Sequence, residues 1–210
     1  MRVEANALGP DTVAIRTLLP PERPGQTGAR FTIRVPRRTT VERLVTSNGA
    51  VRLEGLAGPG RVQTSNGAIR VERHEGRLEL TTANGAIDLS EITGTVTANT
   101  SNGRVSVEEL SGGLDASTSN GSVTITLRRA PRDDLRARTT NGSVTLRIPE
   151  GSEGRIALST SNATIRNEFP LAGGDAIATK THVEGKIGNG GPRLDIRTTN
   201  GSIGLLRSSR

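Results

Sequence analysis

Two glutamates in neighbouring repeats are the best candidates for catalytic chemistry in this chain. Glu54 and Glu72 lie 18 residues apart, each six residues after the asparagine of an Asn-Gly pair. If neighbouring repeats stack as parallel strands, their carboxylates lie about 5 Å apart, near the ~5–5.5 Å separation of a retaining glycosidase. Arg52 and Arg70 occupy the adjacent outward positions, and alternating charge of this kind is typical of an exposed ion ladder. We favour the ion ladder, with a carbohydrate-active enzyme as the alternative.

The other residue types argue against a metal or a cofactor. The sequence has no cysteine, and its only histidines, His74 and His182, are far apart along the chain. A calcium-binding β-roll needs carboxylate oxygens at its turns, whereas these turns offer Ser, Asn and Gly. The sequence contains no phosphate-binding loop. We therefore predict no metal site, no cofactor and no catalytic residues, and two histidines that pack or face solvent.

An arginine-rich insertion is the clearest candidate binding site. The net charge of the chain is +7, which favours anionic partners, but the scarcity of aromatic residues gives no specific signal for nucleic acid. Loops on repeat arrays often carry binding residues. We predict either a solvated loop or a site for anionic polysaccharide, a lipid surface or another protein. The cluster consists of Arg128, Arg129, Arg132, Arg136 and Arg138.

These residues belong to a repeat that organises most of the chain. The phrase Thr-Ser-Asn-Gly, or a close variant, returns with four steps of 18 residues, then steps of 21, 21 and 38. A fixed period of this length is typical of a repeat architecture. The asparagines are Asn48, Asn66, Asn84, Asn102, Asn120, Asn141, Asn162 and Asn200. The threonines two residues earlier are Thr46, Thr64, Thr82, Thr100, Thr118, Thr139, Thr160 and Thr198.

Apolar and polar residues alternate on both sides of each asparagine. Leu78 and Leu80 precede Asn84, for example, and Ile87 and Leu89 follow it. This period of two predicts short strands with one buried face. A second glycine marks another corner, at Gly58, Gly76, Gly94 and Gly112. The constant step favours a coil over separate hairpins, so we predict an all-β fold, a single parallel β-helix or β-solenoid of about 8–9 rungs.

We predict that the asparagine and threonine columns are structural ladders. Asparagine tolerates left-handed backbone angles, and the glycine that follows adopts them without penalty. In stacked rungs, each asparagine amide can donate a hydrogen bond to the oxygen of the next. The threonines fall in the inward register, so their hydroxyls need partners in the backbone or in a neighbouring rung.

Both ends of the repeat depart from the pattern. Residues 12–19 and 29–35 predict two strands before the repeat begins, joined through a proline-rich loop. Because the end of a solenoid is usually capped, we predict cap strands within residues 1–40 and solenoid repeats over residues 41–206, as one domain overall. Residues 167–188 are predicted to form a degraded rung before the last good repeat.

The chain resembles a bacterial family of adhesin-like β-strand-repeat proteins whose function is not defined. The resemblance is carried by Phe31-Thr-Ile-Arg-Val-Pro36, by the serial Asn-Gly phrases, and by Gly185-x-Ile187-Gly188-x-Gly190 before the closing Thr-Thr-Asn-Gly. It implies a β-helical fold without defined catalytic residues. It also implies exposure at a cell surface or attachment to a membrane, although this sequence shows no anchor.

The sequence therefore predicts a non-enzymatic, structural or adhesin-like module that contacts envelope or surface macromolecules. A scaffold that associates end to end is a further alternative. The sequence has no apolar run of about 18 residues and no apolar leader core. We expect a cytoplasmic protein as the sequence stands, or an envelope or extracellular protein if a leader was removed.

Overall fold

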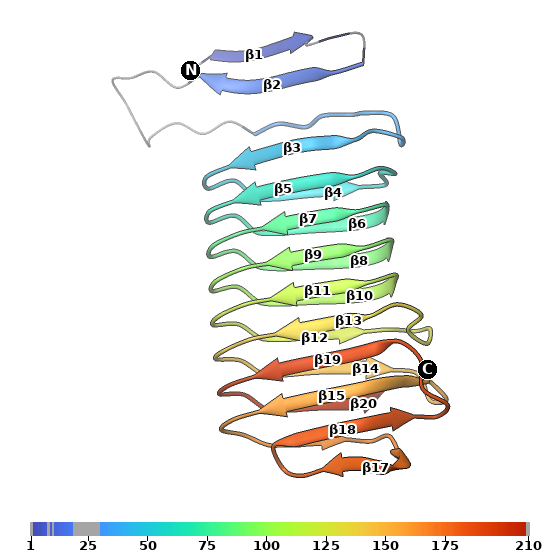
Figure 1. The fold of residues 1–210 in the computed structure, drawn as a ribbon. Coiled ribbons are helices and arrows are strands. Elements are labelled where there is room, and N and C mark those ends of the chain that lie inside the picture. Colours follow the sequence, from blue (N-terminus) through green and yellow to red (C-terminus); the bar gives the residue numbers. More distant parts are fainter. Residues whose placement is uncertain (1, 8, 10, 19–29, 209–210) are drawn as a thin grey trace. The chain divides into compact units, whose positions relative to one another are not determined.

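The computed structural model describes residues 2–7, 9, 11–18 and 30–208, and these residues form strands and loops without any helix. They divide into two units, Met1–Val35 and Pro36–Arg210. The larger unit is a parallel β-solenoid (Figure 1), which confirms the predicted fold class.

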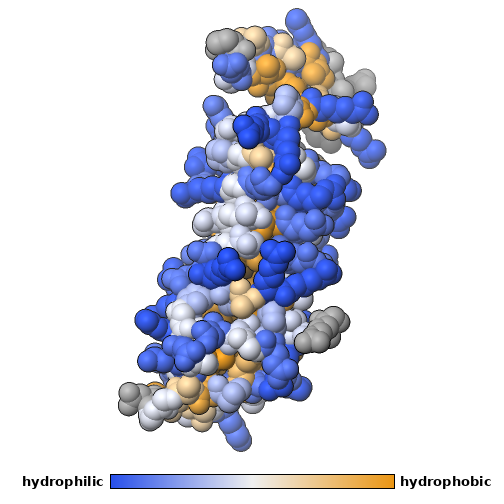
Figure 2. All heavy atoms as spheres, turned by 90° about the vertical axis from the view of Figure 1, so that its right-hand side faces the viewer, coloured by the Kyte–Doolittle hydropathy of each residue, from blue (hydrophilic) through white to orange (hydrophobic). Residues whose placement is uncertain are grey.

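The N-terminal unit contains an antiparallel pair, β1 (Arg2–Ala7) and β2 (Val13–Leu18). Strand β2 lies where the sequence predicts one, but β1 was not predicted. The prediction of a strand at residues 29–35 is wrong for the described residues 30–35, which form no strand. The predicted proline-rich loop lies outside the described residues. Figure 2 shows hydrophobic surface on this unit, in keeping with the exposure of Val3, Val13 and Ile15. Its role as a cap stays a prediction.

The solenoid unit consists of two sheets, and each turn of the solenoid contributes one strand to each sheet. The eight-stranded sheet follows the order β16 (Ile165–Asn167), β20 (Ile203–Arg207), β14 (Val144–Ile148), β12 (Val123–Thr126), β10 (Val105–Ser111), β8 (Ile87–Thr93), β6 (Ile69–Glu75) and β4 (Val51–Glu54). The ten-stranded sheet follows the order β17 (Ala172–Ala178), β18 (His182–Ile187), β15 (Gly154–Thr160), β19 (Arg193–Thr198), β13 (Leu135–Arg138), β11 (Leu114–Ser117), β9 (Val96–Asn99), β7 (Leu78–Thr81), β5 (Gly60–Thr64) and β3 (Val41–Thr46).

Inward aliphatic side chains form one continuous core along the solenoid. Strand pairing places like residues on like residues, so that Val105 pairs with Ile87 on one side and Val123 on the other. All three are at most 1% exposed. The only aromatic residue in this core is Phe169. Because each rung needs only a few Val, Ile or Leu side chains, a chain with few aromatics can still build this fold.

The last rung does not stack in sequence order. About six turns stack in sequence order, fewer than the predicted 8–9 rungs, and β15 then skips one rung position. Strand β19 later fills the gap between β13 and β15, and β20 fills the gap between β14 and β16. Figure 1 shows the red β19 between the yellow β13 and the orange β15. The C-terminal repeat is therefore an internal rung, and the expectation that every repeat stacks on its predecessor in sequence is wrong at this point.

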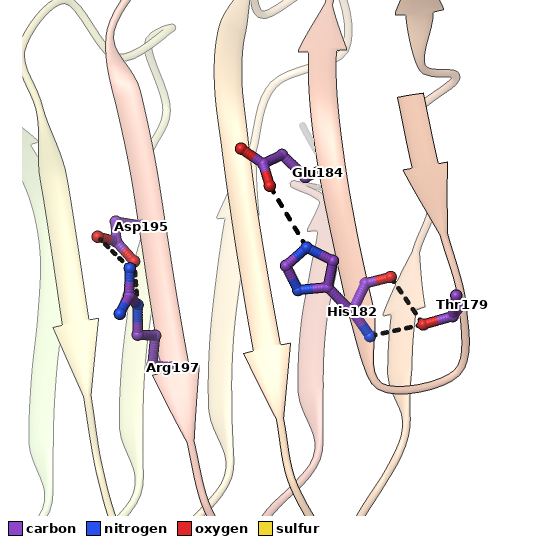
Figure 3. A network of polar contacts seen from close by, with 5 residues as sticks. All are labelled: Thr179, His182, Glu184, Asp195 and Arg197. Carbon is purple, nitrogen blue, oxygen red and sulfur yellow. Dashed lines mark hydrogen bonds and ion pairs between the residues drawn. The ribbon is translucent and has the colours of Figure 1, made fainter. Parts of the chain in front are cut away.

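The predicted degraded rung at residues 167–188 is also wrong. Strands β17 and β18 form an antiparallel hairpin with irregular register, and β18 pairs antiparallel with β15. Its turn is closed by Thr179, whose hydroxyl accepts a hydrogen bond from the His182 amide at 2.9 Å and donates one to the His182 carbonyl at 3.0 Å (Figure 3). Because β18 runs in the opposite direction, it ends the parallel ladder of this sheet.

Removal of the C-terminal repeat should destabilise the folded protein far more than the loss of one terminal rung would. A chain ending at residue 188 lacks β19 and β20, so β13, β14, β15 and β16 all lose a parallel partner. We expect aggregation or loss of the cooperative unfolding transition, measured by light scattering and urea titration followed by circular dichroism. A chain ending at residue 208 is the control. A monomeric product with slightly reduced stability would contradict the intercalated position of this rung.

Candidate functional site

The Asn-Gly turns are held by threonine hydroxyls that link consecutive rungs. The Thr82 hydroxyl accepts a hydrogen bond from the Gly85 amide of its own turn at 3.1 Å and donates to the Gly67 carbonyl of the preceding rung at 3.1 Å. Thr82 is 3% exposed, so both contacts satisfy a hydroxyl removed from water. Hydroxyl donors of the same kind run along the solenoid from Thr64, Thr100, Thr118, Thr139, Thr198 and Thr160.

The asparagine side chains form a second ladder on the outside of the same turns. Beyond Asn48, which only accepts, each Nδ2 donates to the Oδ1 of the preceding rung at 2.6–2.8 Å. The spatial order is Asn48, Asn66, Asn84, Asn102, Asn120, Asn141, Asn200 and Asn162. Asn200 thus lies between Asn141 and Asn162, as the strand order requires. Every amide in the row is engaged with its neighbour, which describes a structural column and not a set of free catalytic groups.

The glycine of each turn is required for a different reason from the one expected. Neither the asparagines nor the glycines after them have positive φ; the positive-φ residues lie at other corners, such as Gly76 and Arg73. A Cβ on Gly85 would instead lie 1.8 Å from the Gly67 carbonyl oxygen. The rungs approach so closely at this column that no side chain fits between them. Ala163 replaces this glycine in the outermost rung of the ladder.

The glutamates with glycosidase-like spacing are partners on adjacent strands and are neutralised by arginines. Glu54 on β4 pairs with Glu72 on β6. Arg52 Nη2 lies 3.1 Å from Glu54 Oε2 and 3.0 Å from Glu72 Oε2, and Arg73 forms a second ion pair with Glu54. Both carboxylates are partly exposed, and the open depression of about 280 Å³ that Glu72 lines does not include Glu54. This geometry is that of a surface ion network.

The arginine cluster splits into two parts. Arg128 forms an ion pair with Glu109 at 2.9 Å, and Arg129 and Arg132 line a cavity of about 380 Å³ whose walls include Leu110 and Leu127. Arg136 and Arg138 do not belong to this loop, because they lie on β13 and point outward. The five arginines are therefore not one loop site.

Because β19 is inserted between β13 and β15, it brings basic residues next to β13, the strand that carries Arg136 and Arg138. These residues would not be neighbours if the rungs stacked in sequence order. Strand β19 places Arg197 directly beside Arg138, and Arg193 beside Arg155 of β15. Lys186 of β18 lies on the other side of Arg155. We name this outer surface of β13, β19, β15 and β18 the basic face; its cations are Arg136, Arg138, Arg193, Arg197, Arg155 and Lys186. In the sequence, this arrangement is indicated only by Ala163 in place of the turn glycine and by the 38-residue step between the last two asparagines of the repeat.

Two carboxylates on the basic face are engaged by their own strands. Asp195 is 3% exposed, and its oxygens accept hydrogen bonds from Arg197 Nε at 2.8 Å and Nη2 at 3.4 Å (Figure 3). Glu184 lies 3.3 Å from His182 Nε2 on β18. His182 is thus a surface residue of this face.

His74 is a buried polar residue in the core of the solenoid. It is 2% exposed and pairs with Ile92 on the next strand, and neither ring nitrogen has a hydrogen-bond partner among the described residues. Burial lowers the pKa of His74 below 6.5, while the backbone of Gly58 and the charge of Glu75 act in the opposite direction. The imidazole is therefore kept neutral, at the expense of two unsatisfied nitrogens.

Nothing in the described part of the chain brings three or more His, Asp or Glu side chains together as metal ligands. Across the same residues, no helix could cross a membrane.

A family model described as Toastrack DUF4097 matches residues 43–206, which is most of the chain and all of its repeats. The chain belongs to the Toastrack DUF4097 family. This family is a domain of unknown function. Comparisons with curated proteins and with solved structures found no match. The Toastrack assignment agrees with the resemblance at the level of a domain of unknown function.

Substitution of a turn glycine should disrupt the Toastrack solenoid. In Gly85→Ala the new methyl group would overlap the Gly67 carbonyl, so we expect a loss of more than about 3 kcal/mol in the free energy of unfolding. Gly174→Ala is the matched control, because a Cβ there meets nothing within 4 Å; its effect should stay within about 0.5 kcal/mol. Urea denaturation measures both. Equal stability of the two variants would show that the rungs can separate at this column.

Replacement of the buried histidine should stabilise the Toastrack solenoid. Leu56 and Leu110 occupy the same position in other rungs, so His74→Leu should fit and raise the free energy of unfolding by about 1–3 kcal/mol. With a lowered folded-state pKa, the wild type should lose stability as the pH falls from about 6.5 towards that value, because the unfolded chain takes up the proton first. This part of the pH dependence should vanish in the variant. An unchanged pH profile in urea titrations would argue against a neutral, desolvated imidazole.

Proposed function

We propose that this Toastrack domain is a non-enzymatic, adhesin-like structural module that contacts envelope or surface macromolecules through its flat outer faces. The supporting observation is the regularity of the solenoid, in which threonine and asparagine ladders fix the rungs and hold outward side chains at strand spacing. Such a surface is organised before binding, so little conformational entropy is lost on contact.

The proposal also accounts for the side chains that could have done chemistry. Glu54 and Glu72 are occupied by arginines on an open sheet, whereas a glycosidase needs two carboxyl groups on either side of a bound sugar. The asparagines donate to one another along the solenoid. The available surface chemistry is charge and hydrogen bonding, which suits adhesion to polar partners.

Binding and turnover assays separate this role from the enzymatic alternative. Purified protein should co-sediment with isolated cell-envelope material, in a salt-dependent way, and release no soluble sugar from a panel of polysaccharides. A Glu54→Gln/Glu72→Gln variant should bind as the wild type does. Release of sugar that disappears in this variant would establish the carbohydrate-active alternative, and failure to bind any envelope fraction would refute the adhesive role.

A further inference from the structure

The basic face is the strongest surface feature that the fold itself creates. The geometry points to a binding site for a linear anionic polysaccharide on the outer surface of β13, β19, β15 and β18. This inference rests on the proposed adhesive function and gives it a defined surface and a class of partner.

Cations stand directly beside one another in two rows of the basic face. Arg138 on β13 pairs with Arg197 on β19. In the second row, Arg155 on β15 lies between Arg193 on β19 and Lys186 on β18. Like charges at directly opposed positions destabilise a sheet. The fold therefore carries an electrostatic cost here that an anion lying across the strands would relieve.

The carboxylates nearby leave much of this charge unneutralised. Asp195 lies 2.8 Å from Arg197 and 3.8 Å from Arg193, and Arg136 lies 3.5 Å from Asp115. By contrast, no ion pair joins Arg138, Arg155 or Lys186 to any other side chain in the described ranges. All three are exposed. Two of them are arginines, whose planar guanidinium groups can bind a carboxylate or sulfate through paired hydrogen bonds.

The rest of the same sheet lacks this excess of positive charge. In β9 and β11 the outward positions are Thr97, Asn99, Asp115 and Ser117, with no cation among them. Further along, Arg61 and Arg77 both contact Glu79. The positive surface is thus confined to the strands around the intercalated rung. Intercalation inserts Arg193 and Arg197 between β13 and β15, where sequence-order stacking would have set Arg138 beside Ser159.

A charged linear polysaccharide fits this surface better than a membrane or a nucleic acid does. The two rows hold two and three cations on successive strands, roughly 4.8 Å apart, which suits a partner that carries charge repeatedly along its length. The neutral outward residues of β15 are Ala157 and Ser159, so no large apolar side chain is available to enter a lipid headgroup layer. The aromatic side chain of this unit, Phe169, is 6% exposed, so it offers no platform on which bases could stack.

The test compares two variants that lose the same charge in different places. Arg138→Gln/Arg155→Gln/Lys186→Gln neutralises the three unpaired cations of the basic face. Arg34→Gln/Arg38→Gln/Arg43→Gln neutralises three exposed arginines elsewhere. The probes are immobilised polygalacturonate for carboxylates and dextran sulfate for sulfates, with neutral dextran as the blank. Affinities are measured by biolayer interferometry at several salt concentrations.

We expect the basic-face variant to lose about tenfold or more in affinity for the charged polysaccharides and the control variant to lose much less. The slope of log K against log salt should fall by about two for the basic-face variant, at roughly 0.7 per lost contact. Urea titration should show that it is at least as stable as the wild type, because repulsion is relieved. Reduced binding therefore reports on the surface and not on unfolding.

Three results would overturn the inference. Equal losses in the two variants would mean that net charge alone attracts the polymers. Tighter binding to duplex DNA, or to vesicles containing phosphatidylglycerol, would assign the face to another class of partner. If the basic-face variant binds envelope material as tightly as the wild type does, the proposed adhesive function stands but its contact surface lies elsewhere. If the wild type itself binds no envelope material, the proposed function is refuted.

Discussion

Close contact between the backbones of stacked turns is the constraint on which this solenoid depends. A hypothetical Cβ on Gly85 would lie 1.8 Å from the carbonyl oxygen of Gly67, and the same approach recurs along the column. This closeness lets the Thr82 hydroxyl reach both its own turn and the preceding one. The close stacking of the turns also aligns the inward aliphatic side chains of successive rungs. A core that is thin and almost free of aromatics suffices because every rung repeats the same contacts.

The same in-register contacts permit a rung to enter from the far end of the chain. The turn at Asn200 offers the same threonine, asparagine and glycine as the turns at Asn141 and Asn162, so it fits between them equally well. Repeats specify how two rungs join but not which two rungs are neighbours. The hairpin β17–β18 and the loops around it supply that information, because they return the chain to the open position. The C-terminal rung thereby locks the preceding ones in place.

The intercalated rung also decides where charge gathers on the surface. Elsewhere, arginines form ion pairs with glutamates of adjacent strands, as Arg52 does with Glu72 and Arg61 with Glu79, although Arg52 itself pairs in register with Arg70. Around β19, cations meet cations, and a carboxylate of the strand itself, Asp195, is buried beneath its arginines. The stability of the solenoid and the charge on its surface thus both depend on the insertion of β19 between β13 and β15. The site we propose for an anionic partner depends on the position of β19 between β13 and β15.

The sequence by itself determined the all-β class, the 18-residue turn and the inward and outward faces, because a side-chain period of two and a fixed repeat depend only on local backbone geometry. It also located the turns, although it assigned the glycines to backbone angle instead of close approach. Strand order at the C terminus, the hairpin at β17–β18 and the neighbours of Arg138 were decided by the tertiary structure alone. Identical rungs have interchangeable edges, so their order is fixed by long-range chain connections that no local pattern encodes.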